Sequence, residues 1–87
     1  MPFVESRVVE AIVQLQTAEQ PQAALELARW SAQLFPESTD LVSLQASIAE
    51  SLGLKGEAVR AGYIAMKNDP NNRFARSLLQ RLGETVR

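Results

Sequence analysis

The fold is decided by residues 36–70, PESTDLVSLQASIAESLGLKGEAVRAGYIAMKNDP. Apolar residues recur with the spacing of an α-helix up to Leu52, and again between a turn at residues 53–56 and a stop at Pro70. The stretch predicts a helix, a tight turn, a second helix and a stop. A proline stands at each end of this stretch. Pro36 and Pro70 are 34 positions apart, and we call this separation of 34 residues the repeat interval.

The same plan fits the residues on either side of this stretch. Helical spacing predicts a helix over 4–15, a break over 17–20 and a helix over 21–35, and a further helix follows over 73–82. One helical hairpin cannot bury its apolar face, whereas stacked hairpins share a continuous core. We therefore predict an all-α fold in which antiparallel helical hairpins stack as a short right-handed α-solenoid of about five helices. The chain, residues 1–87, is expected to form a single domain.

Single residues mark the expected helix ends and close contacts. Ser38 is placed to cap the helix that follows it, and Asn71 or Asn72 is placed to cap the last helix. Gly53 can take the left-handed conformation that ends a helix. Gly62 lies inside a predicted helix, where glycine costs about 1 kcal/mol relative to alanine. We expect a neighbouring helix to approach Gly62 too closely for a Cβ atom.

The helix over 21–35 carries small residues on its predicted core stripe. Ala24, Ala28 and Ser31 belong to this stripe, which Leu34 continues. Small side chains let two helix axes approach closely, so this helix should pack tightly on its neighbour. Trp30 interrupts the pattern of small and polar residues, and we expect it to be a partly buried wedge.

The composition narrows the classes of protein that fit. Cysteine and histidine are absent, which excludes disulfides and thiolate metal sites and removes the commonest general base. Residues 1–13 carry Glu5, Arg7 and Glu10 where a signal peptide needs an unbroken apolar stretch. No apolar run approaches the roughly 20 residues of a membrane span. We expect a soluble, cytoplasmic protein with no metal site and no cofactor.

Charge is distributed unevenly along the chain although the net charge is only −1. Residues 1–52 hold two arginines against seven carboxylates, giving −5, and residues 53–87 hold seven basic residues against three carboxylates, giving +4. One interpretation is that opposite charges meet across neighbouring helices and contribute about 0–1 kcal/mol per exposed pair. The other is a module with oppositely charged ends, whose acidic end attracts a basic partner or the basic end of another copy.

These residues resemble a tetratricopeptide repeat. That family repeats every ~34 residues as a helical hairpin, with a Trp-x2-Leu-Gly-x2-Tyr pattern on the first helix, small and aromatic residues on the second, and a proline at the end. The matching positions in the second repeat are Val42, Gln45, Ala46 and Ala49, then Ala58, Gly62 and Ala65, then Pro70. The aromatic positions hold small or aliphatic residues, which marks a divergent member or a near relative. The resemblance divides the chain into repeats over about 5–38 and 39–72 and a terminal helix over about 73–83.

The resemblance also implies a binding groove, because such arrays bind peptides or helices on the concave face formed by the first helix of each repeat. The lining positions here are Ser6, Val9, Val13, Gln16, Asp40, Ser43, Ser47, Glu50, Phe74, Ser77 and Arg81. Val9 and Val13 fall outside the core stripe of their helix, which a place in the groove explains. Members that grip a C-terminal carboxylate use Lys, Asn and Arg there, so we expect no such clamp. An apolar entrance with an acidic middle suits an amphipathic, partly basic helix or strand.

Three functions stay open from the sequence. The first is a non-catalytic protein–protein interaction module, such as an adaptor, scaffold or small chaperone. A self-assembling subunit, as a dimer or a stacked array, is the alternative. The third is nucleic-acid binding through the basic end of the chain, although nucleic-acid modules are usually basic as a whole. The arginines at the basic end of this chain are Arg73, Arg76, Arg81 and Arg87.

Catalysis is not expected from this sequence. It holds no nucleophile and base in a recognisable pattern and no glycine-rich phosphate loop. Glu10, Glu26, Glu50 and Glu57 each have the spacing of a solvated helix face. We therefore expect no enzyme and no small-molecule substrate.

Overall fold

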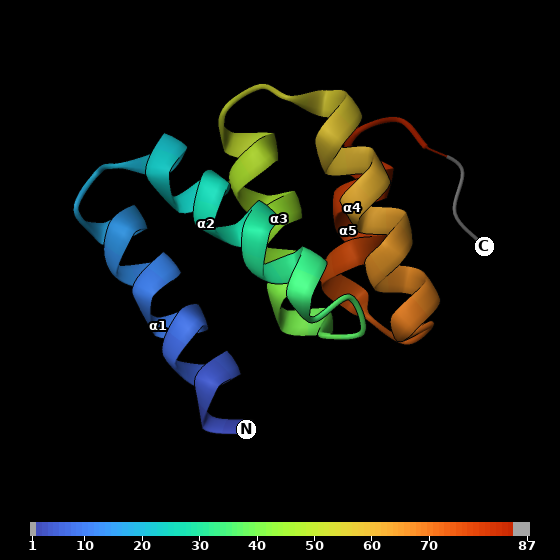
Figure 1. Cartoon of the computed structure of the whole chain (residues 1–87). Helices are drawn as coiled ribbons and strands as arrows, with labels where there is room; N and C mark the ends of the chain where they lie inside the picture. The colour runs from blue at the N-terminus through green and yellow to red at the C-terminus, as the bar shows by residue number, and fades with distance from the viewer. Residues whose placement is uncertain (1, 85–87) are drawn as a thin grey trace.

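A computed structural model describes residues 2–84, with side chains described from residue 6 onward, and that part of the chain is all-α (Figure 1). Its helices are α1 (Pro2–Thr17), α2 (Pro21–Leu34), α3 (Thr39–Ser51), α4 (Lys55–Asn68) and α5 (Arg73–Arg81). Each helix packs antiparallel on the next one along the chain, and α3 also contacts α5. The Cα positions span 33 × 28 × 17 Å, so the molecule is a flat slab. The predicted all-α fold of sequentially packed helices is confirmed.

The repeat interval is present in the helix boundaries. Helices α2 and α4 have the same length of 14 residues, and one repeat interval separates their first residues, Pro21 and Lys55. The same interval separates the starts of α3 and α5, at Thr39 and Arg73. Helix α5 is shorter than α3, with 9 residues against 13. The chain therefore builds two hairpins in the same register and then one further helix.

Left-handed residues end the odd-numbered helices. Glu19, Gly53 and Gly83 have φ angles of 60°, 77° and 83°. In each case the amide of the following residue donates to the carbonyl five positions back, at N···O distances of 2.9 Å. This pattern is the Schellman motif, which glycine adopts most easily because it has no Cβ. The predicted role of Gly53 is confirmed, whereas Glu19 takes the same conformation with a full side chain.

Polar side chains cap the starts of α3 and α5. The Ser38 hydroxyl accepts a hydrogen bond from the Leu41 amide at 3.3 Å, and the Asn72 side-chain oxygen accepts from the Ala75 amide at 3.0 Å. Each bond satisfies one of the amides that a helix start leaves without an intrahelical partner. The predicted cap at Ser38 is confirmed, and Asn72 is the one of the two candidate asparagines that caps α5.

Small residues let the helices pack closely in the core. Ala24, Ala28 and Ser31 of α2 are fully buried, and Ala58, Gly62 and Ala65 of α4 are buried as well. A Cβ placed on Gly62 would lie 2.9 Å from Cδ2 of Leu79, which is closer than real Cβ contacts. The Ser31 hydroxyl donates to the Leu27 carbonyl at 2.8 Å and is thereby satisfied. The expected close approach to Gly62 is confirmed, and the neighbour is α5.

The outer side of α2 corrects two expectations. Trp30 is 56% exposed and not a wedge, and Leu34, which was expected on the core stripe, is 55% exposed. Leu25 is buried instead. Because a helix turns by about 100° per residue, Trp30 and Leu34 lie on a different side of α2 from the buried Ala24–Ala28–Ser31 seam. That seam faces the rest of the core, and the side with Trp30 remains open to solvent.

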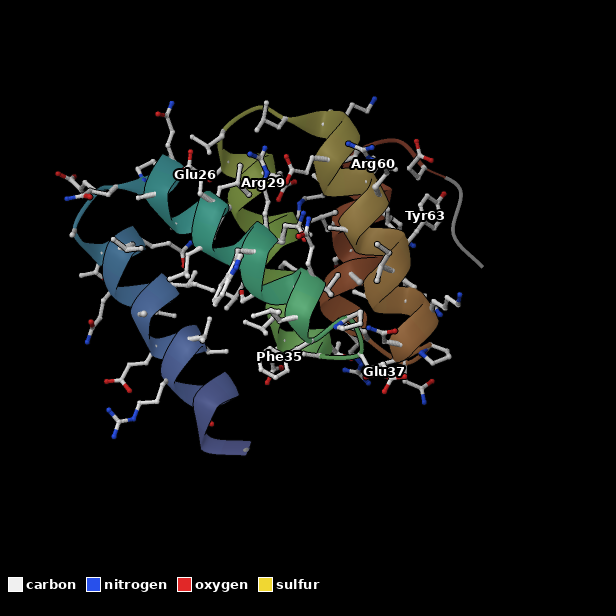
Figure 2. All side chains as sticks on the ribbon, in the orientation of Figure 1. Glu26, Arg29, Phe35, Glu37, Arg60 and Tyr63 are labelled. Carbon is white, nitrogen blue, oxygen red and sulfur yellow. The ribbon has the colours of Figure 1, made fainter. Side chains whose placement is uncertain are left out.

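The C-terminal end of the described chain lies against α4. Tyr63 lies on the outer side of α4 (Figure 2). Its hydroxyl donates to the Glu84 carboxylate at 3.0 Å, and this hydrogen bond raises the pKa of Tyr63. The segment after α5 is thereby tied to α4.

Candidate protein-binding grooves

One cavity opens on the face formed by the odd-numbered helices, and we name it the α1–α3–α5 groove. Its volume is about 340 Å³. It is lined by Val9 of α1, by Asp40, Ser43, Leu44 and Ser47 of α3, and by Phe74 of α5. Three helices that are far apart in the sequence therefore contribute to one site. Five of these six residues are among the positions that the sequence predicted for the groove.

The other predicted groove positions lie outside this cavity. Val13 is exposed one turn after Val9 on α1. Glu50 and Arg81 are paired, with 2.9 Å between Arg81 Nη2 and Glu50 Oε1 and 3.2 Å between Arg81 Nε and Glu50 Oε2. This ion pair joins α3 to α5 and lowers the pKa of Glu50. Ser6, Gln16 and Ser77 are exposed and do not line the cavity.

The α1–α3–α5 groove combines apolar walls with one carboxylate. Val9 is half-buried, and Phe74 on the opposite wall is exposed. Asp40 makes no ion pair within residues 6–84. The Asn72 amide donates to the Ser43 hydroxyl at 3.4 Å, which links the start of α5 to α3. The groove thus offers apolar contact and an uncompensated negative charge.

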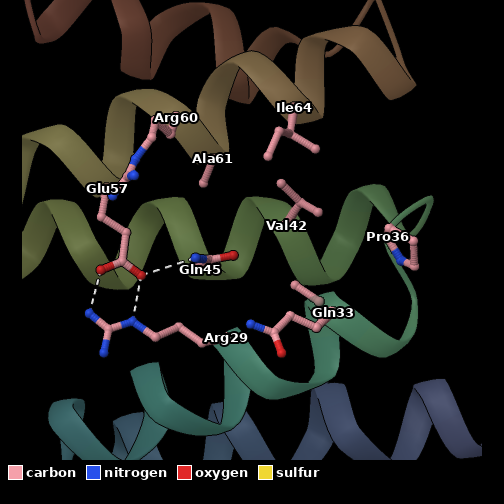
Figure 3. Close-up of a pocket in the computed structure, with 10 residues that line it drawn as sticks. Arg29, Gln33, Pro36, Val42, Gln45, Glu57, Arg60, Ala61 and Ile64 are labelled. Carbon is pink, nitrogen blue, oxygen red and sulfur yellow. Dashed lines mark hydrogen bonds and ion pairs between the residues drawn. The ribbon is translucent and has the colours of Figure 1, made fainter.

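A second cavity, the α2–α4 groove, lies between α2 and α4 (Figure 3). Its volume is about 500 Å³. Part of its lining is apolar, with Val42, Ala61 and Ile64 close to one another, and part is a hydrogen-bonded group around Glu57. The full lining is Arg29, Ala32, Gln33, Pro36, Val42, Gln45, Glu57, Arg60, Ala61 and Ile64.

Glu57 is the centre of the polar group in the α2–α4 groove, and it was not recognised from the sequence. It was expected on a solvated helix face, but its side chain is only 13% exposed. Two nitrogens of the Arg29 guanidinium donate to its carboxylate, with 2.7 Å from Arg29 Nε to Glu57 Oε2, and Gln45 Nε2 donates to the same oxygen at 3.0 Å. The Arg29 hydrogen bonds, and to a lesser extent that of Gln45, lower the pKa of Glu57.

The pairing of Arg29 with Glu57 could not be recognised in the sequence because the two residues are far apart along the chain. Arg29 and Glu57 lie 28 positions apart and on different hairpins, so no helical i, i+4 pattern connects them. Each of the two ion pairs of the described chain joins a residue of the acidic half, 1–52, to a residue of the basic half, 53–87. The acidic half contributes the carboxylate in the pair of Glu50 with Arg81 and the arginine in the pair of Arg29 with Glu57. The interpretation that opposite charges meet across helices therefore applies to these four residues.

The predicted basic cluster is only partly assembled. Arg73 and Arg76 are exposed on α5, and within residues 6–84 neither makes an ion pair. Arg81 is held by Glu50, and Arg87 lies outside the described residues. The two unpaired arginines stand three positions apart on a single helix.

The polar surroundings of Ser43 in the α1–α3–α5 groove come from the start of α5. The nearest polar partner of Ser43 is the Asn72 amide, which donates a hydrogen bond and does not act as a base. In the described part of the chain, no three acidic side chains are grouped to hold a metal ion. No helix within residues 2–84 has the length and apolar character to cross a membrane.

Comparison with known proteins found no protein-family model, no curated protein and no solved structure that matches this chain.

Proposed function

We propose that the chain is a non-catalytic protein-interaction module of the tetratricopeptide type, which binds a segment of a partner protein in the α1–α3–α5 groove. The observation that carries the proposal is the convergence of Val9, Asp40, Ser43, Ser47 and Phe74 on one cavity. These residues come from three helices, and the resemblance to tetratricopeptide repeats selects all five as groove positions from the sequence alone.

The chemistry of the groove favours a basic amphipathic segment. Val9, Leu44 and Phe74 offer apolar contact area, while the hydroxyls of α3 accept and donate hydrogen bonds. Asp40 has no ion pair within the described residues, so a Lys or Arg of the bound segment gains an attraction without displacing an existing partner. An acidic segment would meet repulsion at the same place.

The test uses two synthetic helical peptides that share one leucine stripe and differ in carrying either lysine or glutamate on its flanks. Both are titrated into the ¹⁵N-labelled protein and followed by NMR. We expect the lysine peptide to shift the amides of Val9, Ser43 and Ser47 and the glutamate peptide to leave them unchanged. Asp40→Asn should weaken binding by up to about fivefold, the size of one exposed ion pair.

Matched variants separate the two grooves. Val9→Ser should weaken binding of the lysine peptide, and Ile64→Ser in the α2–α4 groove should leave it unchanged. If the shifts instead map to α2 and α4, or if both peptides bind equally well, the proposed site is wrong. A total lack of binding by either peptide at millimolar concentration would also count against it.

A further inference from the structure

The α2–α4 groove holds one more positive than negative charge. Its charged lining residues are Arg29, Glu57 and Arg60, two arginines against one carboxylate, so their net charge is +1. Both oxygens of Glu57 are engaged, because two nitrogens of the Arg29 guanidinium and Nε2 of Gln45 donate to them. Arg60 is exposed, and its side chain makes neither a hydrogen bond nor an ion pair within residues 6–84. The groove therefore offers one guanidinium without a partner.

The hydrogen bonds around Glu57 hold the polar wall of the groove in place. Arg29 belongs to α2, Gln45 to α3 and Glu57 to α4, so the group joins three helices. An incoming carboxylate would have to break charge-assisted hydrogen bonds to pair with Arg29. Glu26, which lies one turn before Arg29 on α2, offsets the charge of that guanidinium further. A carboxylate meets no such competition at Arg60, which is therefore the place where the groove attracts a negative charge.

An apolar surface lies one helical turn from Arg60. Ile64 follows Arg60 at i+4, which places the two residues next to each other on α4 (Figure 3). Ile64 is 46% exposed, and the buried residues Val42 of α3 and Ala61 of α4 lie close to it. Covering the exposed part of Ile64 would remove apolar area from water, which favours binding. A ligand that fits this groove combines an aliphatic side chain with a negative charge.

The length of the lining restricts the size of the ligand. On α4 the lining extends from Glu57 to Ile64, which is about 10 Å of helix. An extended chain rises by about 3.3 Å per residue, so this length corresponds to roughly three residues. The cavity volume of about 500 Å³ lies within the usual range of ligand-binding cavities. A short extended segment therefore fits the groove better than a long helix.

The two grooves of the molecule lie on different sides of α3. Asp40 and Ser47 line the α1–α3–α5 groove, whereas Val42 and Gln45 line the α2–α4 groove. Because a helix turns by about 100° per residue, these two pairs of residues point in roughly opposite directions. The unpaired charge of the first groove is the carboxylate of Asp40, and that of the second is the guanidinium of Arg60. The grooves therefore differ both in place and in the sign of the charge that they attract.

We infer that the α2–α4 groove is a second protein-binding site, which takes a short acidic segment of a partner protein. A carboxylate of the segment pairs with Arg60, while an aliphatic side chain next to it packs on Ile64. Nucleic acids gain affinity from many simultaneous phosphate contacts, and a single unpaired arginine beside an apolar surface does not supply them. This inference does not rest on the proposed function, since the two grooves share no residue and each is followed by its own amide signals.

The test uses capped peptides of about six residues, too short to form a stable helix, in which two leucines are flanked either by glutamates or by glutamines. Each peptide is titrated into the ¹⁵N-labelled full chain and followed by NMR. We expect the glutamate peptide to shift the amides of Gln45, Arg60 and Ile64 and to leave those of Val9 and Ser47 unchanged. The glutamine peptide should bind about threefold more weakly, the size of one exposed ion pair, and added salt should reduce this difference.

Variants with equal changes inside and outside the groove separate the site from a general effect of charge or of apolar surface. Arg60→Gln should weaken binding of the glutamate peptide about threefold, whereas Lys55→Gln, which removes the same charge from another side of α4, should leave it unchanged. Ile64→Ser should weaken binding about tenfold, and Val13→Ser, at a 45% exposed position on α1, should not. Circular dichroism shows whether each variant is folded.

Four outcomes would overturn the inference. The first is a lack of binding by the glutamate peptide up to millimolar concentration, and the second is equal affinity for the glutamate and glutamine peptides. The third is an equal loss of affinity in Arg60→Gln and Lys55→Gln, which would show that only the net charge matters. The fourth is displacement of the peptide by a single-stranded oligonucleotide of the same charge that shifts the same amides, which would identify the ligand as a nucleic acid.

Discussion

Replacing Gly62 by alanine tests whether the contact between α4 and α5 is as close as the structure shows. The new Cβ would lie 2.9 Å from Leu79 Cδ2, 3.1 Å from Leu79 Cγ and 3.3 Å from Leu78 Cδ2. Carbon atoms prefer about 3.5–4.0 Å, and both leucines are fully buried. Overpacking of this kind costs about 1–3 kcal/mol, while the helix propensity of alanine returns about 1 kcal/mol. We expect Gly62→Ala to destabilise the protein by about 1 kcal/mol.

The assay is thermal and urea unfolding followed by circular dichroism in the far ultraviolet, where a loss of about 1 kcal/mol lowers the midpoint by roughly 5 °C. Gly56→Ala is the control, because Gly56 lies in the same helix and a Cβ there meets nothing within 4 Å. It should stabilise the protein by up to about 1 kcal/mol. In a Leu79→Ala background, which removes the obstructing side chain, Gly62→Ala should also become stabilising.

Whether Gly62→Ala lowers or raises the stability decides whether α4 and α5 are in close contact at this position. If Gly62→Ala raises the unfolding midpoint of the otherwise unchanged protein as Gly56→Ala does, α5 does not approach α4 as closely as described. If its effect is the same with and without Leu79, the two residues are not coupled and the steric reasoning fails.

Three further predictions concern a helix end, a cap and pH. Glu19→Gly should stabilise the protein by about 0.5–1 kcal/mol by removing left-handed strain, whereas Glu19→Ala, which keeps the strain, should not; both are measured by urea unfolding. Asn72→Ala should cost about 1 kcal/mol through loss of the α5 cap, and a similar loss for Asn71→Ala would contradict this assignment. The pKa values of Glu50 and Glu57 are lowered in the folded state, so the unfolded chain binds protons more readily and stability should fall as the pH drops from about 5. In Glu57→Gln this fall should be shallower in a series of unfolding curves between about pH 5 and pH 3, and an unchanged slope would rule out the contribution of that carboxylate.

Local and periodic features of the fold could be predicted from the sequence. The helix stops, the cap at Ser38 and the tight contact at Gly62 depend on short-range chemistry, and the repeat interval fixes how the hairpins follow one another. The groove positions came from the resemblance to tetratricopeptide repeats and not from periodicity, and five of them line the α1–α3–α5 groove.

Features that depend on which neighbour covers a helix were not predictable in this way. Trp30 looked like a partly buried wedge because its helix is otherwise rich in small residues, but no helix of the described residues covers that side of α2. Glu57 looked like a solvated residue because its partner Arg29 belongs to the other hairpin. Both errors have the same origin, since periodicity identifies the face of a helix and does not say what packs against it.

The order in which the helices pack also has a consequence for motion. Helix α3 contacts α2, α4 and α5, whereas α1 packs chiefly on α2. Local opening of a helical array begins where a helix has the fewest neighbours, so α1 should detach at a lower free energy than α3. Because α1 supplies Val9, one wall of the groove belongs to the least supported helix. A ligand that contacts Val9 would therefore hold α1 in place, and part of its binding free energy would be used to suppress local opening of that helix. Hydrogen exchange of the α1 amides should then be slower in the complex than in the free protein.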